Sequence, residues 1–206
     1  MCGRYYIEID EKELREIVNA VEKGLISDNE QMTFIKTSGE IFPTDIVPVQ
    51  TGINKYQPMK WGFSGHGGKP VINARSETAA QKPMFSEAMR ERRCVIPASG
   101  YYEWKTEGKK KTKYQFHIPG KSLYFAGCYR REPHKPFYSF CILTRQAAWG
   151  AEAIHPRMPV IIPQKHIETW LNEMPSEINY AVPDLEFEAV ITSQQLSLFG
   201  EAEDEK

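Results

Sequence analysis

The start of the chain, Met1-Cys2-Gly3-Arg4, places a cysteine where it can acquire two reactive groups. A small second residue normally permits removal of the initiator methionine, and Cys2 would then carry a free α-amine and a thiol on adjacent carbons. The ordinary pKa values are about 7.7–8.0 for an α-amine and about 8.5 for a thiol, so both are partly deprotonated near neutral pH. Such a 1,2-aminothiol can attack an amide carbonyl through sulfur, or condense with an aldehyde through nitrogen and close a ring through sulfur. The alternative is an incidental cysteine.

Three further polar segments stand between apolar ones and supply groups that could assist this nucleophile. They are residues 73–78, 94–104 and 155–159. A nucleophile needs a proton shuttle and an oriented carbonyl or aldehyde, which Glu103, His155 and Asn73 could provide. Each has a structural alternative: Glu103 could face solvent on an alternating strand, His155 could be a surface histidine in a proline-flanked loop, and Asn73 could end a strand.

Cationic and aromatic side chains accompany these segments. Three arginines stand singly beside them, namely Arg4, Arg75 and Arg157. They have ordinary salt-bridge interpretations. Trp61 and Trp104 are most simply core aromatics, although an exposed tryptophan beside a basic groove would stack on bases. The lysine-rich residues 105–113 are typical of a solvated hairpin tip. These features permit a nucleic-acid partner without establishing one.

Bulk composition indicates an ordinary globular protein. The chain has 206 residues, is 41% hydrophobic and 26% charged, and carries a net charge of −1. Acidic residues follow Ile7, so no apolar run suggests a signal peptide or a membrane span. The four cysteines lie far apart without a C-x-x-C pair, which disfavours a zinc site and demands no oxidising compartment. We expect a cytoplasmic protein.

Hydrophobic patterns predict an α+β domain with a mainly antiparallel, barrel-like β core flanked by a few helices. Helices are expected at residues 10–21, 85–92 and 164–172. Short β-like runs, most of them bounded by proline or glycine, predict strands at residues 4–9, 46–49, 56–61, 94–96, 101–105, 114–118, 123–129, 138–144, 160–162 and 187–191. We expect one domain over residues 2–191 and a tail over residues 192–206.

Together the motifs resemble the SRAP (SOS-response-associated peptidase) family over roughly residues 2–190. The matching motifs, in order, are Cys2-Gly3-Arg4, Trp61-Gly62, Asn73-Ala74-Arg75-Ser76-Glu77-Thr78, residues 94–104, Phe125-Ala126-Gly127 and His155-Pro156-Arg157-Met158-Pro159. The resemblance implies a protein that shields abasic sites in single-stranded DNA, or at junctions with duplex, by a covalent crosslink. The family name records a supposed thiol autopeptidase that trims its own N-terminus.

The resemblance also implies catalytic roles for four residues. Cys2 matches the crosslinking nucleophile, whose amine forms a Schiff base with the sugar aldehyde and whose thiol closes a thiazolidine. Asn73 matches the residue that positions the Cys2 main chain. Glu103 matches the acid/base that assists ring opening, imine formation and reversal, and His155 matches the histidine that protonates or orients the sugar hydroxyl.

DNA contacts follow from the same resemblance, with two departures. Arg4, Arg75 and Arg157 resemble phosphate contacts, and Trp61 and Trp104 resemble aromatic elements near the DNA path. Residues 63–66 replace a more usual apolar-Ile-Pro sequence, which puts the wedge against a duplex end in question. Pro156 replaces a common aspartate, which puts the orientation of His155 in question.

The expected partner is single-stranded DNA containing abasic sites, bound by a nucleoid-associated monomer that needs no metal or organic cofactor. Three alternatives remain open from the sequence: a cysteine-dependent peptidase, an N-terminal-nucleophile amidotransferase, and a non-covalent single-stranded-DNA binding module. The first two would use the Cys2 thiol on an amide, whereas the third would not need Cys2 at the terminus.

The tail carries a separate short motif. Gln195-Leu196-Ser197-Leu198-Phe199 resembles the segment by which bacterial replication and repair proteins bind the DNA polymerase sliding clamp. Leu198 and Phe199 would fill an apolar pocket, Leu196 would add apolar contact, and Gln195 would supply a polar anchor. The alternative is that the apolar residues pack back on the domain as a final strand.

Overall fold

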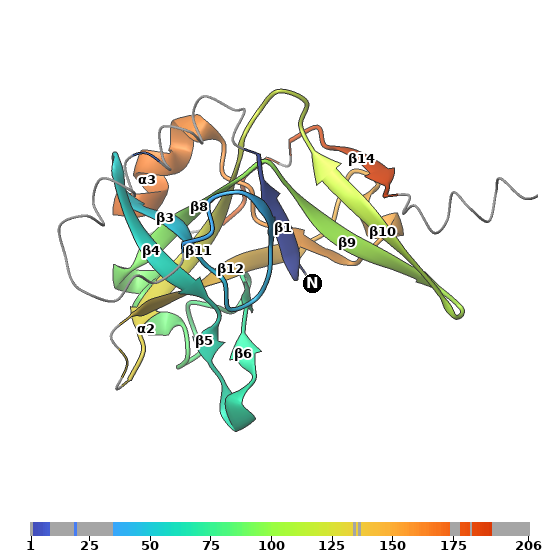
Figure 1. Cartoon of the computed structure of the whole chain (residues 1–206). Coiled ribbons are helices and arrows are strands. Elements are labelled where there is room, and N and C mark those ends of the chain that lie inside the picture. Colours follow the sequence, from blue (N-terminus) through green and yellow to red (C-terminus); the bar gives the residue numbers. More distant parts are fainter. Residues whose placement is uncertain are drawn as a thin grey trace, which may run out of the picture.

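The computed structural model describes residues 2–8, 19, 35–133, 135, 137–173, 178–181 and 183–190. Most of this part belongs to two β-sheets that share one core, with short helices at the periphery (Figure 1). The helix expected at residues 10–21, except for residue 19, lies outside the described residues. So do Gln195, Leu196, Leu198 and Phe199 of the tail.

Five strands close into a barrel. They are β3 (Ile46–Gly52), β4 (Lys55–Trp61), β8 (Arg93–Ala98), β11 (Leu123–Arg131) and β12 (Tyr138–Gln146). Antiparallel pairs join β4 to β3, β8 to β11 and β11 to β12. The ring is completed by a single β3–β8 pair, Gln50 with Val95, and by a short parallel pairing between β4 and β12. The predicted barrel-like β core is therefore confirmed.

Strand β12 pairs with four partners in turn, and this matters for the site. Its first half pairs with β11 and β4, and its second half with β7 (Asn73–Arg75) and β13 (Arg157–Pro159). Thr144 lies opposite both Arg75 and Pro159 in these two registers. Two polar segments that are 80 residues apart in the chain thus meet at one end of β12.

The second sheet is antiparallel and brings the start of the chain against the barrel. Its order is β14 (Glu186–Ala189), β10 (Lys110–His117), β9 (Gly100–Glu107), β1 (Arg4–Ile7) and β2 (Gly39–Ile41). The Tyr5 ring of β1 packs edge-on against Trp61 of β4 and Phe125 of β11, at centroid distances of 5.2 and 6.0 Å. Large aromatic rings at these distances stabilise the junction between the sheets.

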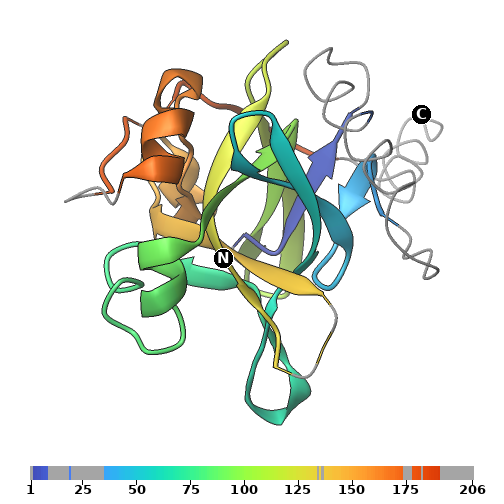
Figure 2. The same ribbon diagram turned by 90° about the vertical axis from the view of Figure 1, so that its left-hand side faces the viewer.

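A small hairpin projects from the barrel (Figure 2). It comprises β5 (Phe63–Ser64), the turn η1 (His66–Gly68) and β6 (Pro70–Val71). Phe63 is fully buried, with the Arg130 guanidinium 4.3 Å from its ring centroid. The backbone of Ser64 is held in place because its N–H donates a hydrogen bond to the buried Glu132 carboxylate. Residues 63–66, which depart from the family pattern, are therefore anchored by the buried side chain of Phe63.

Two short helices cover one side of the barrel and are joined by one buried arginine. They are α2 (Ser86–Glu91) and α3 (Ile167–Asn172), the latter preceded by η3 (Gln164–His166); a further turn, η2, spans Ala151–Ala153. Arg93, at the start of β8, donates to the carbonyls of Met89 and Arg90 at 2.8 and 2.9 Å and to those of Trp170 and Leu171 at 2.7 and 3.3 Å. Carbonyls in a last helical turn lack intrahelical partners, and one guanidinium satisfies those of both helices.

Most predicted elements are found at or near the predicted positions, with one exception. Residues 160–162 do not form a strand, and β13 instead ends at Pro159. The reason lies in their backbone hydrogen bonds. The carbonyl oxygen of Val160 accepts from the N–H of Ala126 on β11, whereas the N–H of Val160 donates to Leu143 on β12. The N–H of Ile162 donates to the carbonyl oxygen of Tyr124, again on β11. These residues are shared between β11 and β12 without a continuous ladder to either. In the described part of the chain, no helix is long and apolar enough to cross a membrane.

Replacing Arg93 with leucine should lower the free energy of unfolding by about 2–4 kcal/mol, because several carbonyls at the ends of α2 and α3 lose their donor. Arg90→Ala is the matched control, since its side chain is largely exposed and pairs only with Glu91 among the described residues. The control should change stability by no more than about 0.5 kcal/mol. Chemical denaturation of the two variants would show equal stability if Arg93 had no such role.

Candidate active site

Cys2 is fully buried in the core that the two sheets share. Its thiol lies 3.8 Å from the backbone carbonyl oxygen of Arg4, to which it donates. Its own carbonyl oxygen accepts a 2.8 Å hydrogen bond from Nδ2 of Asn73. Asn73 begins β7 rather than ending a strand, and the pairing of β7 with β12 sets its position. The structure therefore brings these two predicted site residues into direct contact.

Glu103, on β9, is also buried and influences the Cys2 thiol. Arg4 lies opposite Tyr102 and Tyr5 opposite Tyr101, so Glu103 shares the face of the sheet that carries both Tyr5 and Tyr101. The side chain is only 4% exposed, which rules out the solvent-facing alternative. Burial raises the pKa of its carboxyl group, against the opposing influence of the positively charged amino terminus and of His155. A carboxyl group with a raised pKa is suited to proton transfer near neutral pH.

Glu103 also influences the pKa of the Cys2 thiol. Burial raises the pKa of the Cys2 thiol strongly, and the negative charge of Glu103 raises it further. Both effects favour the neutral thiol over the thiolate.

His155 completes this group. Its Nδ1 lies 3.8 Å from Oε1 of Glu103, close enough for an ion pair when the imidazole is protonated. The backbone N–H of Arg157 donates to the same Nδ1 at 3.0 Å. The same Nδ1 also lies 3.0 Å from the carbonyl oxygen of Arg157, so the tautomer of the imidazole decides which of these two backbone groups it bonds. The turn around Pro156 thus orients His155 without an intervening aspartate.

Arg157 is held by a carboxylate that sequence analysis did not single out. Its guanidinium donates to both Glu77 oxygens at 2.6 and 2.8 Å, and to the Thr144 carbonyl oxygen at 2.6 Å. The bond from Arg157 lowers the pKa of the Glu77 carboxyl group to about 2. Arg75, at the end of β7, is exposed beside this pair in the β12 register. The Glu77–Arg157 pair could not be predicted from the sequence spacing, because it depends on β7 and β13 both pairing with β12.

Arg4 lies on a second charged surface, with aromatic rings beside it. Its guanidinium donates to Glu40 at 2.9 Å and lies 3.6 Å from the ring centroid of Phe42 and 5.6 Å from that of Trp104. Lys113 also donates to Glu40, at 2.6 Å. Trp104 is half-buried, so part of its ring faces solvent among these cations.

The structure corrects the expectation for Trp61. Its side chain is fully buried, stacks on Phe140, and donates its indole N–H to the Ile72 carbonyl oxygen at 3.0 Å. Trp61 is thus a core aromatic and offers no ring face to DNA.

A comparison with protein families matches residues 1–194 to "SOS response associated peptidase (SRAP)". The chain belongs to the SRAP family. This SRAP chain is 33% identical over 138 residues to the abasic site processing protein YoaM of Bacillus subtilis, a match that covers 62% of the chain and 61% of the relative. It is 33% identical over 121 residues to the abasic site processing protein YedK of Escherichia coli, covering 56% of the chain and 54% of the relative. The matched region thus spans between half and two thirds of the length of these relatives.

Solved structures support the fold. A protein from Bacteroides thetaiotaomicron superposes with a TM-score of 0.72 at 21% identity, covering 95% of the SRAP chain and 94% of that protein. A protein from Bordetella bronchiseptica gives a TM-score of 0.70 at 22% identity, covering 93% of this chain and 100% of that one. At these identities the likeness establishes the fold alone.

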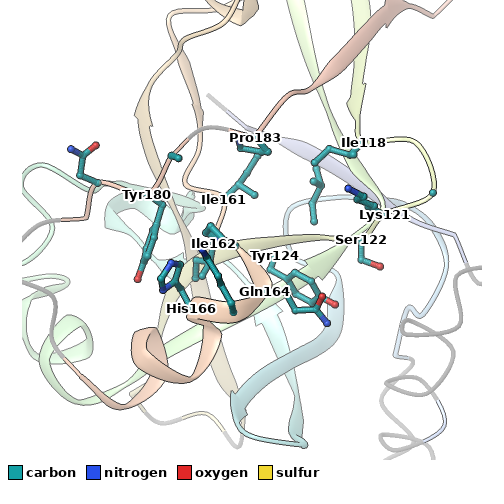
Figure 3. A pocket seen from close by; sticks show the side chains of 16 residues that line it. Ile118, Lys121, Ser122, Tyr124, Ile161, Ile162, Gln164, His166, Tyr180 and Pro183 are labelled. Carbon is teal, nitrogen blue, oxygen red and sulfur yellow. The ribbon is translucent and has the colours of Figure 1, made fainter.

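A pocket of about 770 Å³ lies away from the Cys2 group (Figure 3). It opens between the start of β11, the segment that leads into α3, and residues 179–181 and 183. Figure 3 shows Tyr180 and His166 at one side of it and Ile118 and Lys121 at the other. None of the predicted site residues lines it, and its lining is mostly apolar. Among the described residues, no three His, Cys, Asp or Glu side chains are grouped as metal ligands.

The Glu77–Arg157 pair should make the free energy of unfolding depend on pH over a defined pH range. The pKa of Glu77 is lower in the folded chain, about 2, than its ordinary value of 4.5, so the pair's contribution is complete above about pH 5. That contribution should decline as the pH falls from about 4.5 and disappear near pH 2. Because the Glu77 side chain is half exposed, we expect no more than about 1 kcal/mol at low salt.

Unfolding free energies of the parent chain and Glu77→Gln, measured from pH 7 to pH 3, would show this as a difference that narrows with acid. Glu152→Gln serves as the control, because this exposed carboxylate shows no ion pair among the described residues. A parent–variant difference that stays constant between pH 5 and pH 3 would contradict the assignment.

Proposed function

We propose that this chain captures abasic sites in single-stranded DNA through a covalent bond to Cys2, after removal of Met1. The observation that carries the proposal is the convergence of a buried Cys2, its Asn73 anchor, Glu103 and His155 in one group. The curated relatives, named as abasic site processing proteins, support the substrate class. Because the match covers under two thirds of those relatives, the substrate is a proposal for this chain.

The first step is imine formation. An abasic deoxyribose exists mostly as a closed hemiacetal, so a proton must move before the aldehyde at C1′ is exposed. Glu103 would take the hydroxyl proton, and His155, whose Nδ1 lies 3.8 Å from Oε1 of Glu103, would supply a proton to the ring oxygen. The α-amine of Cys2 then adds to the aldehyde carbon and water leaves, giving an imine. An α-amine is better suited than lysine, whose ordinary pKa is about 10.4.

The second step is ring closure by the thiol. Sulfur bonds to the imine carbon, the electron pair of the C=N bond moves to nitrogen, and the thiol proton finishes on that nitrogen. The product is a thiazolidine, and the step needs no oxidant or reductant. The Asn73 bond to the Cys2 carbonyl oxygen would hold the main chain while both new bonds form on the same residue. Preorganisation of this kind lowers the entropic barrier.

We propose that the DNA backbone lies across the two cationic surfaces beside this group. One surface carries Arg75 and Arg157, and the other carries Arg4 and Trp104. Phosphate contacts position a strand without reading its bases, and a partly exposed tryptophan can stack on a neighbouring base. Trp61 is excluded from this role by its burial.

The central prediction is that processed protein incubated with abasic single-stranded DNA forms an adduct that survives denaturing electrophoresis. Cys2→Ser should bind the same DNA but give no stable adduct, because an imine without a thiol remains open to hydrolysis. DNA of the same sequence without the abasic site is the substrate control. Protein that retains a blocked residue before Cys2 should be inactive; equal crosslinking by blocked and processed protein would refute the aminothiol mechanism.

Glu103→Gln should slow adduct formation by about 10²–10⁴-fold, the usual contribution of general acid–base catalysis, with non-covalent DNA affinity nearly unchanged. Glu107→Gln is the matched control on the same strand, since this carboxylate is exposed and pairs with Lys105. Crosslinking rates at saturating DNA, together with binding isotherms, separate the two effects. A loss confined to binding would assign Glu103 a role in DNA contact instead.

A further inference from the structure

A second pocket, at the opposite end of β12 from Arg157, carries an excess of positive charge. It has a volume of about 400 Å³ and opens where the end of β11 and the start of β12 meet α2 and the residues before it. Three guanidiniums line it, those of Arg92, Arg130 and Arg131, against one carboxylate, that of Glu87. A concave surface dominated by one sign of charge attracts ions of the opposite sign. The pocket is therefore suited to an anion.

The three arginines differ in how far their charge is already neutralised. Arg130 donates to both oxygens of the buried Glu132 carboxylate, at 3.1 and 3.4 Å, so this pair is balanced. Arg92 donates to Glu87 at 2.8 Å, and its Nε has no acceptor among the described residues. Arg131 is exposed and forms no ion pair in the described part of the chain. One positive charge is thus free, and a second is held by Glu87, whose side chain is 64% exposed.

Two exposed apolar side chains line the same pocket and restrict the kind of anion it fits. Met84 and Tyr138 are 39% and 38% exposed. Tyr138 lies directly opposite Arg131 in the β11–β12 ladder, so the two side chains share one face of the sheet. An exposed aromatic ring can stack on a base while the neighbouring guanidinium pairs with a phosphate. An acidic peptide would use the guanidiniums and leave the ring uncovered, so the combination favours a nucleotide.

Strand β12 connects this pocket to the proposed DNA site. Tyr138 begins the strand, and Thr144, six positions further along, lies opposite Arg75. At roughly 3.4 Å per residue the two positions are about 20 Å apart. A nucleic-acid strand advances about 3.4 Å per nucleotide in B-form geometry, so about six nucleotides cover this span, and fewer when the strand is stretched. A single strand that contacts Arg75 can therefore also reach the pocket.

We propose that this pocket binds a phosphate and an unpaired base of the single-stranded DNA that flanks the abasic site. The inference rests on the proposed function for its substrate. Arg92 and Arg131 contact the phosphate, and Tyr138 stacks on the base with Met84 beside it. Glu87 competes with the phosphate for Arg92. Such a contact holds the flank of the strand without reading its sequence, because neither a phosphate nor a stacked ring face identifies the base.

The test is the affinity of the full-length protein for oligonucleotides that carry tetrahydrofuran, an abasic analogue without an aldehyde, so that binding stays non-covalent. One oligonucleotide has about three nucleotides on each side of the analogue, too few to reach the pocket, and the other has about ten. The longer one should bind about tenfold more tightly. Arg131→Ala should abolish most of this gain and leave the affinity for the shorter one unchanged. The slope of log affinity against log salt should also fall by about 0.7 for the longer one, the loss of one phosphate contact.

Arg90→Ala is the matched control for charge. Arg90 is an exposed arginine of α2 that pairs with Glu91 and does not line the pocket, so its loss should leave the gain with length intact. Glu87→Gln should act in the opposite direction and tighten binding of the longer oligonucleotide several-fold, because the competitor for Arg92 loses its charge. Tyr138→Ala should weaken that binding, whereas Tyr138→Phe, which keeps the ring, should not.

Equal affinity for the two lengths would overturn the proposal, as would equal losses in Arg131→Ala and Arg90→Ala or weaker binding by Glu87→Gln. A gain that appears only when the flank is double-stranded would exclude the unpaired base. Binding of a free mononucleotide at Arg131 without any gain from length would make the pocket a nucleotide site instead of a DNA site. If true abasic DNA gives no crosslink, the proposed function fails, but the length dependence with the analogue still decides whether the pocket binds the strand.

Discussion

A single hydrogen bond, from Asn73 Nδ2 to the carbonyl oxygen of Cys2, joins the start of the chain to a residue 71 positions away. Its geometry depends on two independent pairings. β1 must pair with β9 to bring Cys2 into the core, and β7 must pair with β12 to bring Asn73 to the same place. The barrel is the common frame, because β12 belongs to it and Tyr5 of β1 packs on its aromatic side chains. A terminal segment that would ordinarily fray is thereby held rigidly.

Burial holds Cys2 in position but works against the ionisation of its thiol. A reactive sulfur placed where its exposed fraction is zero has an acidity far below that of an ordinary thiol, and the carboxylate that could accept protons is itself driven toward its neutral form. The two groups are linked, since the negative charge of Glu103 disfavours the Cys2 thiolate. Under the proposed function, the site would stay unreactive until a substrate supplies the electrophile. Partial charges in the site would then count for more than they would in water, because few solvent molecules compete with them.

Local pattern located most of the longer strands but did not predict how they close into a barrel. Alternating residues located β9, β10, β11 and β12 to within a few positions, but the barrel closes through one β3–β8 pair and a short parallel contact of β4 with β12, which no nearby residues encode. The Glu77–Arg157 pair was missed for the same reason, since it follows from the meeting of β7 and β13 on β12. Family motifs identified Cys2, Asn73, Glu103 and His155 as a set. They misassigned Trp61, because a motif does not distinguish a ring in the core from one at the surface.

The arginines beside the site are already ordered in the free chain. Glu77 holds Arg157 through two bonds, and Glu40 holds Arg4 while also accepting from Lys113. A guanidinium fixed by a carboxylate loses less side-chain entropy when a phosphate approaches, but its charge is partly neutralised, which weakens long-range attraction. With a net charge of −1, the chain lacks the strongly basic character by which proteins bind nucleic acid at random. Under the proposed function, reversible binding would therefore remain modest, and selectivity would come from a reaction that only an aldehyde-bearing sugar can complete at Cys2.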